Sequence, residues 1–180
     1  MKPEVEDAFL VQRAQEGYLD AYSELVQRHG PLAYRVALRM LGDHHDAEDI
    51  AQESLVAAWQ QLPRFKAESS FATWLYRIVS RRALNRITRT KFDGPIDLLD
   101  HADDAAAGPA STTERNLAID AVTNAVTALP PAQRIVVVLH HFEGLSYAEV
   151  ARITNSTVPA VRSHLHRARR TLTKTLEEWR

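Results

Sequence analysis

The stretch that decides the fold is GLSYAEVARITNSTVPAVRSHLHRARR, residues 144–170. Ser146 and Glu149 form an S-x-x-E capping box, which predicts that a helix begins directly after the serine. The Asn-Ser-Thr sequence at 155–157 is typical of a tight turn, because asparagine tolerates the left-handed conformation. A second helix follows, with Pro159 in its first turn. Two short helices on either side of a tight turn predict a helix-turn-helix, whose second helix lies in the DNA major groove.

The second of these helices is amphipathic. Apolar residues recur at spacings of four, three and four and predict one buried stripe, formed by Val161, Leu165, Ala168 and Leu172. The opposite face is basic and polar, which in isolation is also typical of a solvated surface. The capping box, the turn and the stripe occur together at the spacing of a helix-turn-helix, which favours DNA binding. Arginine on the outer face can bridge the O6 and N7 atoms of guanine. The candidate DNA contacts are Arg162, Ser163, His166, Arg167 and Arg170.

Length and composition narrow the class of protein. The 180 residues suffice for one medium domain or two small ones. Cysteine is absent, so the chain has no disulfide framework, thiolate metal site or thiol nucleophile. Residues 1–17 are acidic and lack the apolar region of a secretory signal. No run approaches the ~18 apolar residues needed to cross a bilayer, so we expect a cytoplasmic protein without membrane insertion.

The net charge of −1 hides segments of opposite sign. Residues 77–91 and 162–174 contain arginine and lysine but no acid. Acidic residues concentrate instead within 43–53 and 93–104. This distribution indicates several partners of different charge.

Helical periodicity runs through most of the chain and predicts an all-α protein. Prolines and glycines indicate where the helices begin and end. We expect two helices within residues 5–40, broken near Gly17 and at Gly30-Pro31. Further helices are expected over about 46–62, 70–89 and 114–129, with another beginning at Pro130-Pro131.

Residues 92–113 interrupt the helical pattern. Glycine-proline pairs at 94–95 and 108–109 bracket aspartates and a run of alanines. Such a segment is typical of a flexible acidic linker. It predicts two small helical domains, residues 1–91 and residues 114–180, the second of which contains the helix-turn-helix.

The β-branched run Ile135–Leu139 is typical of a buried strand. No other segment offers a strand to pair with it, and a lone strand cannot satisfy its backbone groups. We therefore expect a buried helix here.

Asp46, Asp49, Gln52 and Glu53 fall within one arc of the predicted helix over 46–62. Apolar residues fill most of the remaining surface, so these four residues form an acidic ridge beside a broad apolar face. The alternative is a solvated first turn, whose carboxylates the positive end of the helix favours. That alternative explains Asp46 and Asp49 well but Glu53 less so.

Two histidines near the acidic ridge raise the alternative of a metal site or of acid–base chemistry. His44 and His45 are adjacent, so they do not share a helical face as an i, i+4 pair does. The pair His140-His141 repeats this unfavourable spacing. We expect no metal, no cofactor and no catalytic residue.

Residues 64–89 interleave aromatic side chains with seven basic ones. Bases of single-stranded DNA stack on aromatic rings while cations follow the backbone, so this composition suits melted DNA. The alternative is that Trp74, Leu75 and Ile78 simply belong to the core of a small helical domain.

Three segments taken together resemble a bacterial sigma factor of the sigma-70 family, in its extracytoplasmic-function (ECF) group. They are DAEDIAQESLVAAWQQLPRF (46–65), SSFATWLYRIVSRRALNRITR (69–89) and the stretch from ALPPAQRIVVVLHHFEG at 128 onward to residue 170. The resemblance covers nearly the whole chain. It implies a promoter-specificity subunit with no catalysis of its own, since the polymerase core performs nucleotide transfer.

In this family the counterpart of the acidic ridge docks on the clamp helices of the largest polymerase subunit. A second contact reaches the flap of the second-largest subunit, and an anti-sigma factor is a further partner to consider. The resemblance therefore implies that Asp46, Asp49, Gln52 and Glu53 bind core RNA polymerase.

The family's aromatic-basic segment melts and reads the promoter −10 element, capturing a base flipped from the non-template strand. Flipping has an unstacking cost that a preformed pocket can offset. The last helix reads the −35 element as duplex, which is the role implied for Arg162 and its neighbours. The −10 candidates are Arg64, Lys66, Ser69, Ser70, Phe71, Trp74, Arg77, Arg81 and Arg86.

The chain departs from the family at three positions. The family often has asparagine where this chain has Arg81, threonine where it has Ala160, and arginine where it has His164. These departures leave the individual base contacts open.

Two rival functions also remain open from the residues alone. One is a conventional helix-turn-helix regulator that binds duplex operator without polymerase, and the other is a metal-dependent hydrolase using residues 43–49.

Overall fold

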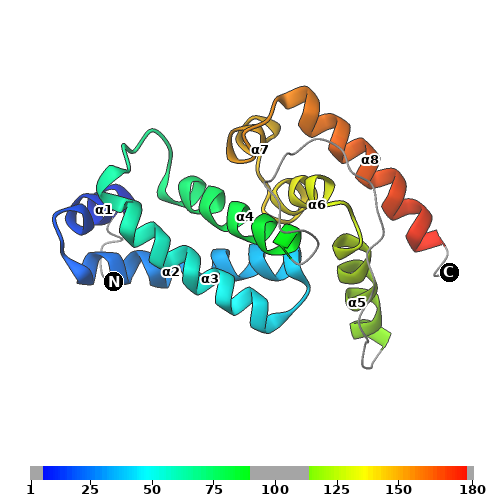
Figure 1. Cartoon of the computed structure of the whole chain (residues 1–180), viewed down its shortest axis with the longest axis horizontal. Helices are drawn as coiled ribbons and strands as arrows, with labels where there is room; N and C mark the ends of the chain where they lie inside the picture. The colour runs from blue at the N-terminus through cyan, green and yellow to red at the C-terminus, as the bar shows by residue number, and fades with distance from the viewer. Residues whose placement is uncertain (1–5, 90–113, 178–180) are drawn as a thin grey trace.

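The computed structural model describes residues 6–89 and 114–177, and every regular element within them is helical (Figure 1). The expected linker, residues 92–113, lies outside the described residues. The prediction of an all-α chain is confirmed. The elements are α1 (Asp7–Gln15), α2 (Leu19–Leu41), α3 (His44–Gln61), the 3₁₀ turn η1 (Leu62–Arg64), α4 (Phe71–Arg89), α5 (Glu114–Thr127), α6 (Pro131–Val137), the π-turn η2 (Val138–Phe142), α7 (Tyr147–Ile153) and α8 (Val158–Glu177).

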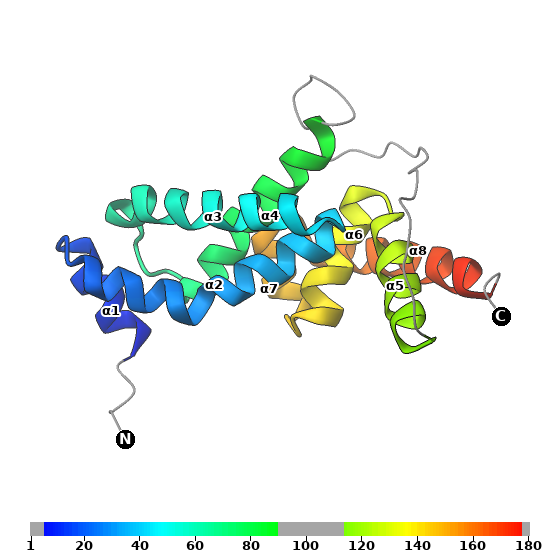
Figure 2. The same cartoon turned by 90° about the horizontal axis from the view of Figure 1, so that it is seen from below.

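Helices α1 to α4 form the N-terminal region, in which α2 packs along α3 and α4 (Figure 2). Leu25, Val36, Leu75 and Val79 are fully buried between these helices. The expected break near Gly17 is confirmed, because α1 ends at Gln15 and the glycine has a positive φ of 97°.

The expected break at Gly30-Pro31 is wrong, because α2 continues through both residues. Pro31 costs one backbone hydrogen bond, and the residue is exposed. Leu25 and Leu32, on either side of the pair, are both buried in the same core. Packing along the whole length of α2 outweighs the local signal of glycine and proline.

The C-terminal region confirms the buried helix expected at Ile135–Leu139. This run lies in α6 and η2 and is almost fully buried. The helix-turn-helix is also present as expected, formed by α7 and α8. Both halves of the capping box occur at Ser146 and Glu149, and Asn155 adopts a left-handed φ of 51°.

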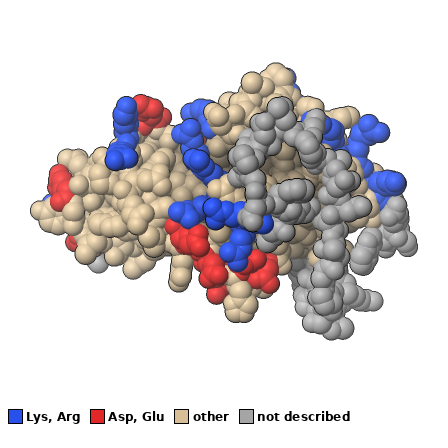
Figure 3. Space-filling view, viewed as in Figure 1, with Lys and Arg blue, Asp and Glu red and all other residues tan. Residues whose placement is uncertain are grey.

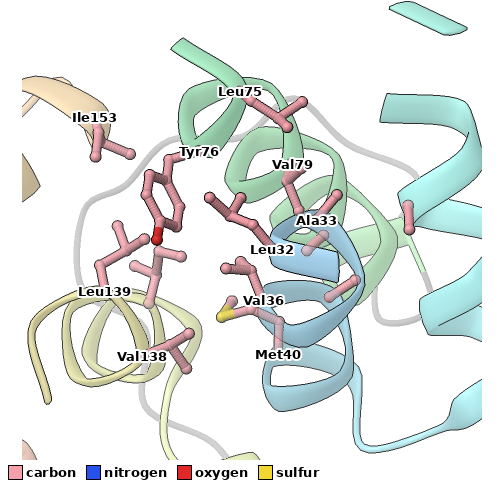
Figure 4. Packing of buried hydrophobic residues seen from close by; sticks show 14 of the residues in the cluster. Leu32, Ala33, Val36, Met40, Leu75, Tyr76, Val79, Val138, Leu139 and Ile153 are labelled. Atoms are coloured by element: carbon pink, nitrogen blue, oxygen red, sulfur yellow. The ribbon is translucent and has the colours of Figure 1, made fainter. Parts of the chain in front are cut away.

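The two regions pack directly against each other through one continuous apolar core (Figure 4). Val36 and Met40 of α2 and Tyr76 of α4 face Val138 and Leu139 of η2. The sequence analysis predicted two domains but not this contact between them.

Gly30→Ala tests whether α2 is continuous. A Cβ on Gly30 would lie 3.8 Å from Leu55 Cδ1, an ordinary contact. Because alanine favours the helix more than glycine does, we expect the free energy of unfolding in urea to rise by about 0.5–1 kcal/mol.

Gly42→Ala is the matched control, since its φ is +73° and its Cβ would lie only 2.9 Å from Thr127 Cγ2. We expect this substitution to destabilise the protein by more than about 1 kcal/mol. Destabilisation of the same size by Gly30→Ala would contradict a continuous α2.

Candidate polymerase and nucleic-acid interfaces

The acidic ridge lies on the solvent side of α3. Asp43 caps this helix by accepting a hydrogen bond from the Asp46 backbone N–H at 2.9 Å, which lowers the pKa of the Asp43 carboxyl. Asp46 pairs with Arg86 of α4, and Glu53 pairs with Arg82 at 2.9 Å. These pairs are solvent-exposed, so each contributes at most about 1 kcal/mol and can exchange with a partner's cations.

Asp49 and Gln52 are exposed between the two ion pairs. Within the described part of the chain, neither side chain makes a hydrogen bond or an ion pair. Val56 extends the same face by one turn and is 56% exposed. The sequence analysis missed Val56, because a valine in a helical pattern indicates a core position. The ridge therefore combines unpaired acidic and polar groups with one exposed apolar residue.

The candidate −10 surface begins in the loop before α4 and continues along that helix. Trp74 is half-buried, with the Phe65 ring stacked on it at 4.6 Å and the Phe71 ring tilted against it at 5.8 Å. Phe71 is only 3% exposed, so it supports Trp74 from the core and does not present its own ring to solvent. Ser70 accepts a hydrogen bond from the Thr73 backbone N–H at 3.1 Å and thereby orders the first turn of α4.

The loop itself is held in a defined shape. Gln15 of α1 donates hydrogen bonds from its side-chain amide to the carbonyls of Leu62 and Phe65. Ala67 has a left-handed φ of 55°, which costs a residue with a Cβ about 1–2 kcal/mol. Nothing local in the sequence points to Gln15, since its partners lie about fifty residues away. The exposed polar residues of this loop are Arg64, Lys66, Glu68 and Ser70, with Ser69 half-buried.

Basic residues of α4 line a groove that continues from Trp74 towards the end of the helix. Arg77 and Arg81 are exposed on it, and Arg86 reaches across to Asp46. Figure 3 shows basic side chains directly beside acidic ones in the middle of this face of the molecule. The groove is closed on one side by the end of α7 and its turn, residues 153–155.

The face of α8 opposite the buried stripe carries the five predicted contacts. Val161, Leu165 and Ala168 are buried, as expected, and Leu172 is half-buried against the same core. His164 lies half-buried at the flank of the stripe. Of the candidate contacts, Arg162, Ser163, His166 and Arg170 are exposed and Arg167 is half-buried.

Arg162 is positioned by an aromatic pair. Its guanidinium lies over the Tyr147 ring, 5.6 Å from the centroid, and the His140 ring packs against Tyr147 at 4.6 Å. His140 Nδ1 is 2.7 Å from the Leu145 carbonyl oxygen, which fixes that ring. Residues of η2 and α7 thus support the Arg162 side chain on α8.

Family models match both regions. Sigma-70 region 2 matches residues 25–92, and Sigma-70 region 4 matches residues 119–172. The "ECF RNA polymerase sigma factor SigW" of Bacillus subtilis (strain 168) is 30% identical over 178 residues, covering 93% of this chain and 95% of the relative. The chain belongs to the ECF group of the sigma-70 family.

Other relatives of this sigma factor agree. The "RNA polymerase sigma-H factor" of Pseudomonas aeruginosa is 31% identical over 187 residues, covering 98% of this chain and 97% of the relative. The solved structure of "CnrH in complex with the cytosolic domain of CnrY" has a TM-score of 0.69 and 28% identity, covering 96% of this chain and 97% of CnrH. As a family member, the protein is a transcription initiation factor that binds RNA polymerase and acts at promoters.

The sigma factor also has two buried charged groups that the sequence analysis missed. Arg134 of α6 is 5% exposed and donates hydrogen bonds to the carbonyls of Met40, Thr127 and Leu129. Burial lowers the pKa of its guanidinium to about 10. Glu143 after η2 has a side chain only 3% exposed. Both contact the N-terminal region, so neither has a local sequence signature.

Two absences concern only the described residues, 6–89 and 114–177. No group of three or more His, Cys, Asp or Glu side chains among them is placed to hold a metal ion. None of the helices formed by these residues combines the length and apolar character needed to cross a membrane.

Arg134→Met removes a buried donor while keeping most of the apolar volume. Because three carbonyls at helix ends lose their partner, we expect a loss of about 2–4 kcal/mol in the free energy of unfolding. Arg82→Ala is the control and is expected to cost no more than about 0.5 kcal/mol, since it removes only an exposed ion pair. Equal losses in urea titrations would contradict a structural role for Arg134.

Proposed function

We propose that the chain directs polymerase through three separate surfaces. The acidic ridge of α3 binds core RNA polymerase, the loop and groove of α4 bind the melted −10 strand, and the outer face of α8 reads the −35 duplex. The observation that carries this proposal is that one chain exposes an acidic ridge on α3, a basic groove on α4 directly beside it and a basic outer face on α8. Bridging polymerase and DNA raises effective concentration, so each surface alone is expected to bind weakly.

The polymerase contact is supported by the exposure of the acidic ridge. Asp49 and Gln52 are available without breaking any intramolecular interaction, and Asp46 and Glu53 need only exchange an exposed ion pair. Val56 adds an exposed apolar residue at one end of this face. A basic partner helix fits this arrangement, which matches the role of the clamp helices in the family.

The −10 contact is supported by a stacking platform with cations beside it. Trp74 is held by Phe65 and Phe71, and Arg77 and Arg81 are exposed along the same groove. Gln15 holds the loop at 64–70 in place in the absence of DNA. The entropic cost of ordering this loop therefore does not have to be met when a flipped base is captured. Phe71 acts here by positioning Trp74.

The −35 contact is supported by the helix-turn-helix geometry. The buried stripe fixes the rotation of α8, so Arg162, Ser163, His166, Arg167 and Arg170 share its outer side. We place Arg162 against a base edge, because Tyr147 and His140 restrain its guanidinium.

A second protein contact involves an apolar groove between α5, η2 and α8, lined by Val122, Val126, Phe142 and Leu172. We propose that the flap of the second-largest polymerase subunit occupies it.

The solved relative CnrH carries a bound partner, the cytosolic domain of CnrY. We propose that this sigma factor likewise binds an anti-sigma factor. Because the partner of CnrH is a cytosolic domain, we propose that this sigma factor also acts in the cytoplasm.

Purified chain with core polymerase is expected to produce promoter-dependent transcripts in vitro. A conventional regulator would instead bind a duplex operator tightly without polymerase and give no such transcripts. Tight duplex binding in the absence of core, with no transcript in its presence, would contradict the proposed function.

Asp49→Lys tests the polymerase contact. It reverses a charge at a position with no intramolecular ion pair, so we expect at least about tenfold weaker binding to core, as for a partner charge at an interface. Stability is expected to stay within about 0.5 kcal/mol of the wild type. Glu16→Lys makes the same change of charge at the C-terminal cap of α1, and core affinity should be unchanged, as measured by fluorescence anisotropy. If both variants weakened binding to core polymerase equally, the effect would be one of overall charge, and the proposed contact at Asp49 would be contradicted.

Arg162→Ala tests the −35 contact. Loss of a base-edge contact is expected to cost about 1–3 kcal/mol of discrimination at one position of the −35 element. The measurement is competition binding of polymerase holoenzyme to promoters altered one base pair at a time. Uniform weakening across all sequences would show that Arg162 contacts only phosphate.

A further inference from the structure

The loop before α4 is clamped by a helix that lies far away in the sequence. Gln15, the last residue of α1, donates from its side-chain amide to the Leu62 carbonyl oxygen at 2.9 Å and to the Phe65 carbonyl oxygen at 2.8 Å. These acceptors lie 47 and 50 residues further along the chain. The last carbonyls of a helix need partners from outside it, and one amide here serves two such groups at the end of η1.

The loop has little packing of its own to keep it in this shape. Residues 66–68 at its tip are all exposed. Ala67 has a left-handed φ of 55°, a conformation that disfavours any residue with a Cβ. Such backbone strain persists only where the surrounding structure holds it in place. The hydrogen bonds from Gln15 are part of that surrounding structure.

Helix α1 provides a firm base for the clamp. Its inner face is buried in the apolar core through Leu10, Val11 and Ala14. At its first turn Asp7 pairs with Arg28 of α2 at 3.2 Å, and its other carboxylate oxygen lies 2.6 Å from His29 Nε2. The His29 ring packs against Phe71 at 5.3 Å, and Phe71 packs against Trp74. The fixed helix α1 is therefore connected, through α2, to the aromatic cluster around Trp74.

The clamp also acts on that cluster directly. Phe65, whose carbonyl accepts one of the hydrogen bonds from Gln15, stacks its ring on Trp74 at 4.6 Å. A shift of the loop backbone at Phe65 would therefore move the ring that covers one side of Trp74. The match to Sigma-70 region 2 begins at residue 25, after the end of α1, so it assigns no role to Gln15.

We propose that Gln15 is a positioning residue for the melted −10 strand, which keeps the loop at 64–70 in the one shape that captures a flipped base. This inference rests on the proposed function of the loop and of α4. A loop that samples other shapes binds its base less tightly, in proportion to the time spent in the competent shape. The cations along α4 bind the phosphate backbone whatever the sequence. Loss of the clamp therefore lowers base preference more than it lowers overall affinity for single strands.

The clamp itself is tested without DNA, by limited trypsin digestion of the native full chain. Gln15→Glu places a carboxylate against two carbonyl oxygens, and Gln15→Leu removes the donor without adding charge. Cleavage after Arg64 and Lys66 is expected to be at least about threefold faster in both variants than in the wild type. Unchanged cleavage in both variants would overturn the clamp.

Gln12→Glu and Gln12→Leu are the matched controls. Gln12 lies about one turn earlier on α1 and is exposed, and its side chain makes no hydrogen bond within the described part of the chain. Both substitutions repeat the changes made at Gln15 in charge and polarity. Cleavage in the loop is expected to stay at the wild-type rate, and acceleration equal to that of the Gln15 variants would overturn the clamp.

The positioning role is tested by base preference. The complex of the full chain with core polymerase is mixed with a pool of random single strands about 12 nucleotides long, and the bound strands are sequenced, with core alone as background. The wild type and the Gln12 controls are expected to enrich one base at the captured position. The Gln15 variants should lose about three- to tenfold of that preference. Duplex binding by α8 and helical content should stay unchanged, which a general loss of structure would not allow.

These readouts separate the clamp from the proposed function. If the wild type enriches no base, the loop does not read the −10 strand and the proposed function fails, while the digestion still decides whether the clamp exists. If the Gln15 variants are cleaved faster but keep full base preference, the positioning role is overturned and the proposed function stands. Faster cleavage together with reduced preference supports both.

Discussion

The burial of one carboxylate constrains the whole arrangement. Glu143 is surrounded by donors from α2 and α4, so its burial favours the orientation in which the C-terminal region meets these two helices. Arg134 reinforces that orientation by binding carbonyls of α2 and α5. Apolar packing is less directional, and these charged contacts fix how the regions meet.

The surfaces for outside partners follow a different physical rule. On α3 and α8 the charges are exposed, and the ion pairs at Asp46 and Glu53 are weak enough to exchange. Buried charges hold the chain together, while exposed charges remain available for polymerase and DNA. This division explains how a protein with a net charge of −1 presents strongly charged local surfaces.

Local patterns predicted much of the fold and of the candidate site. The capping box at Ser146, the turn at Asn155 and the stripe along α8 depend on neighbouring residues, so the sequence contains the needed information. Contacts between distant segments were not predictable in this way. Packing of α2 overrode the break expected at Gly30-Pro31, and Glu143 was not singled out because its donors lie 67 to 108 residues away.

The distance between the two regions tests the central claim most directly. Spin labels on Gln12→Cys of α1 and Lys174→Cys of α8, both at exposed positions, report it in the free protein with and without the substitution Glu143→Gln. Our account predicts one narrow distribution of distances with Glu143 in place and a broader one in the Glu143→Gln variant, because the buried carboxylate holds the two regions together. Identical distributions of distances in the two proteins would contradict it.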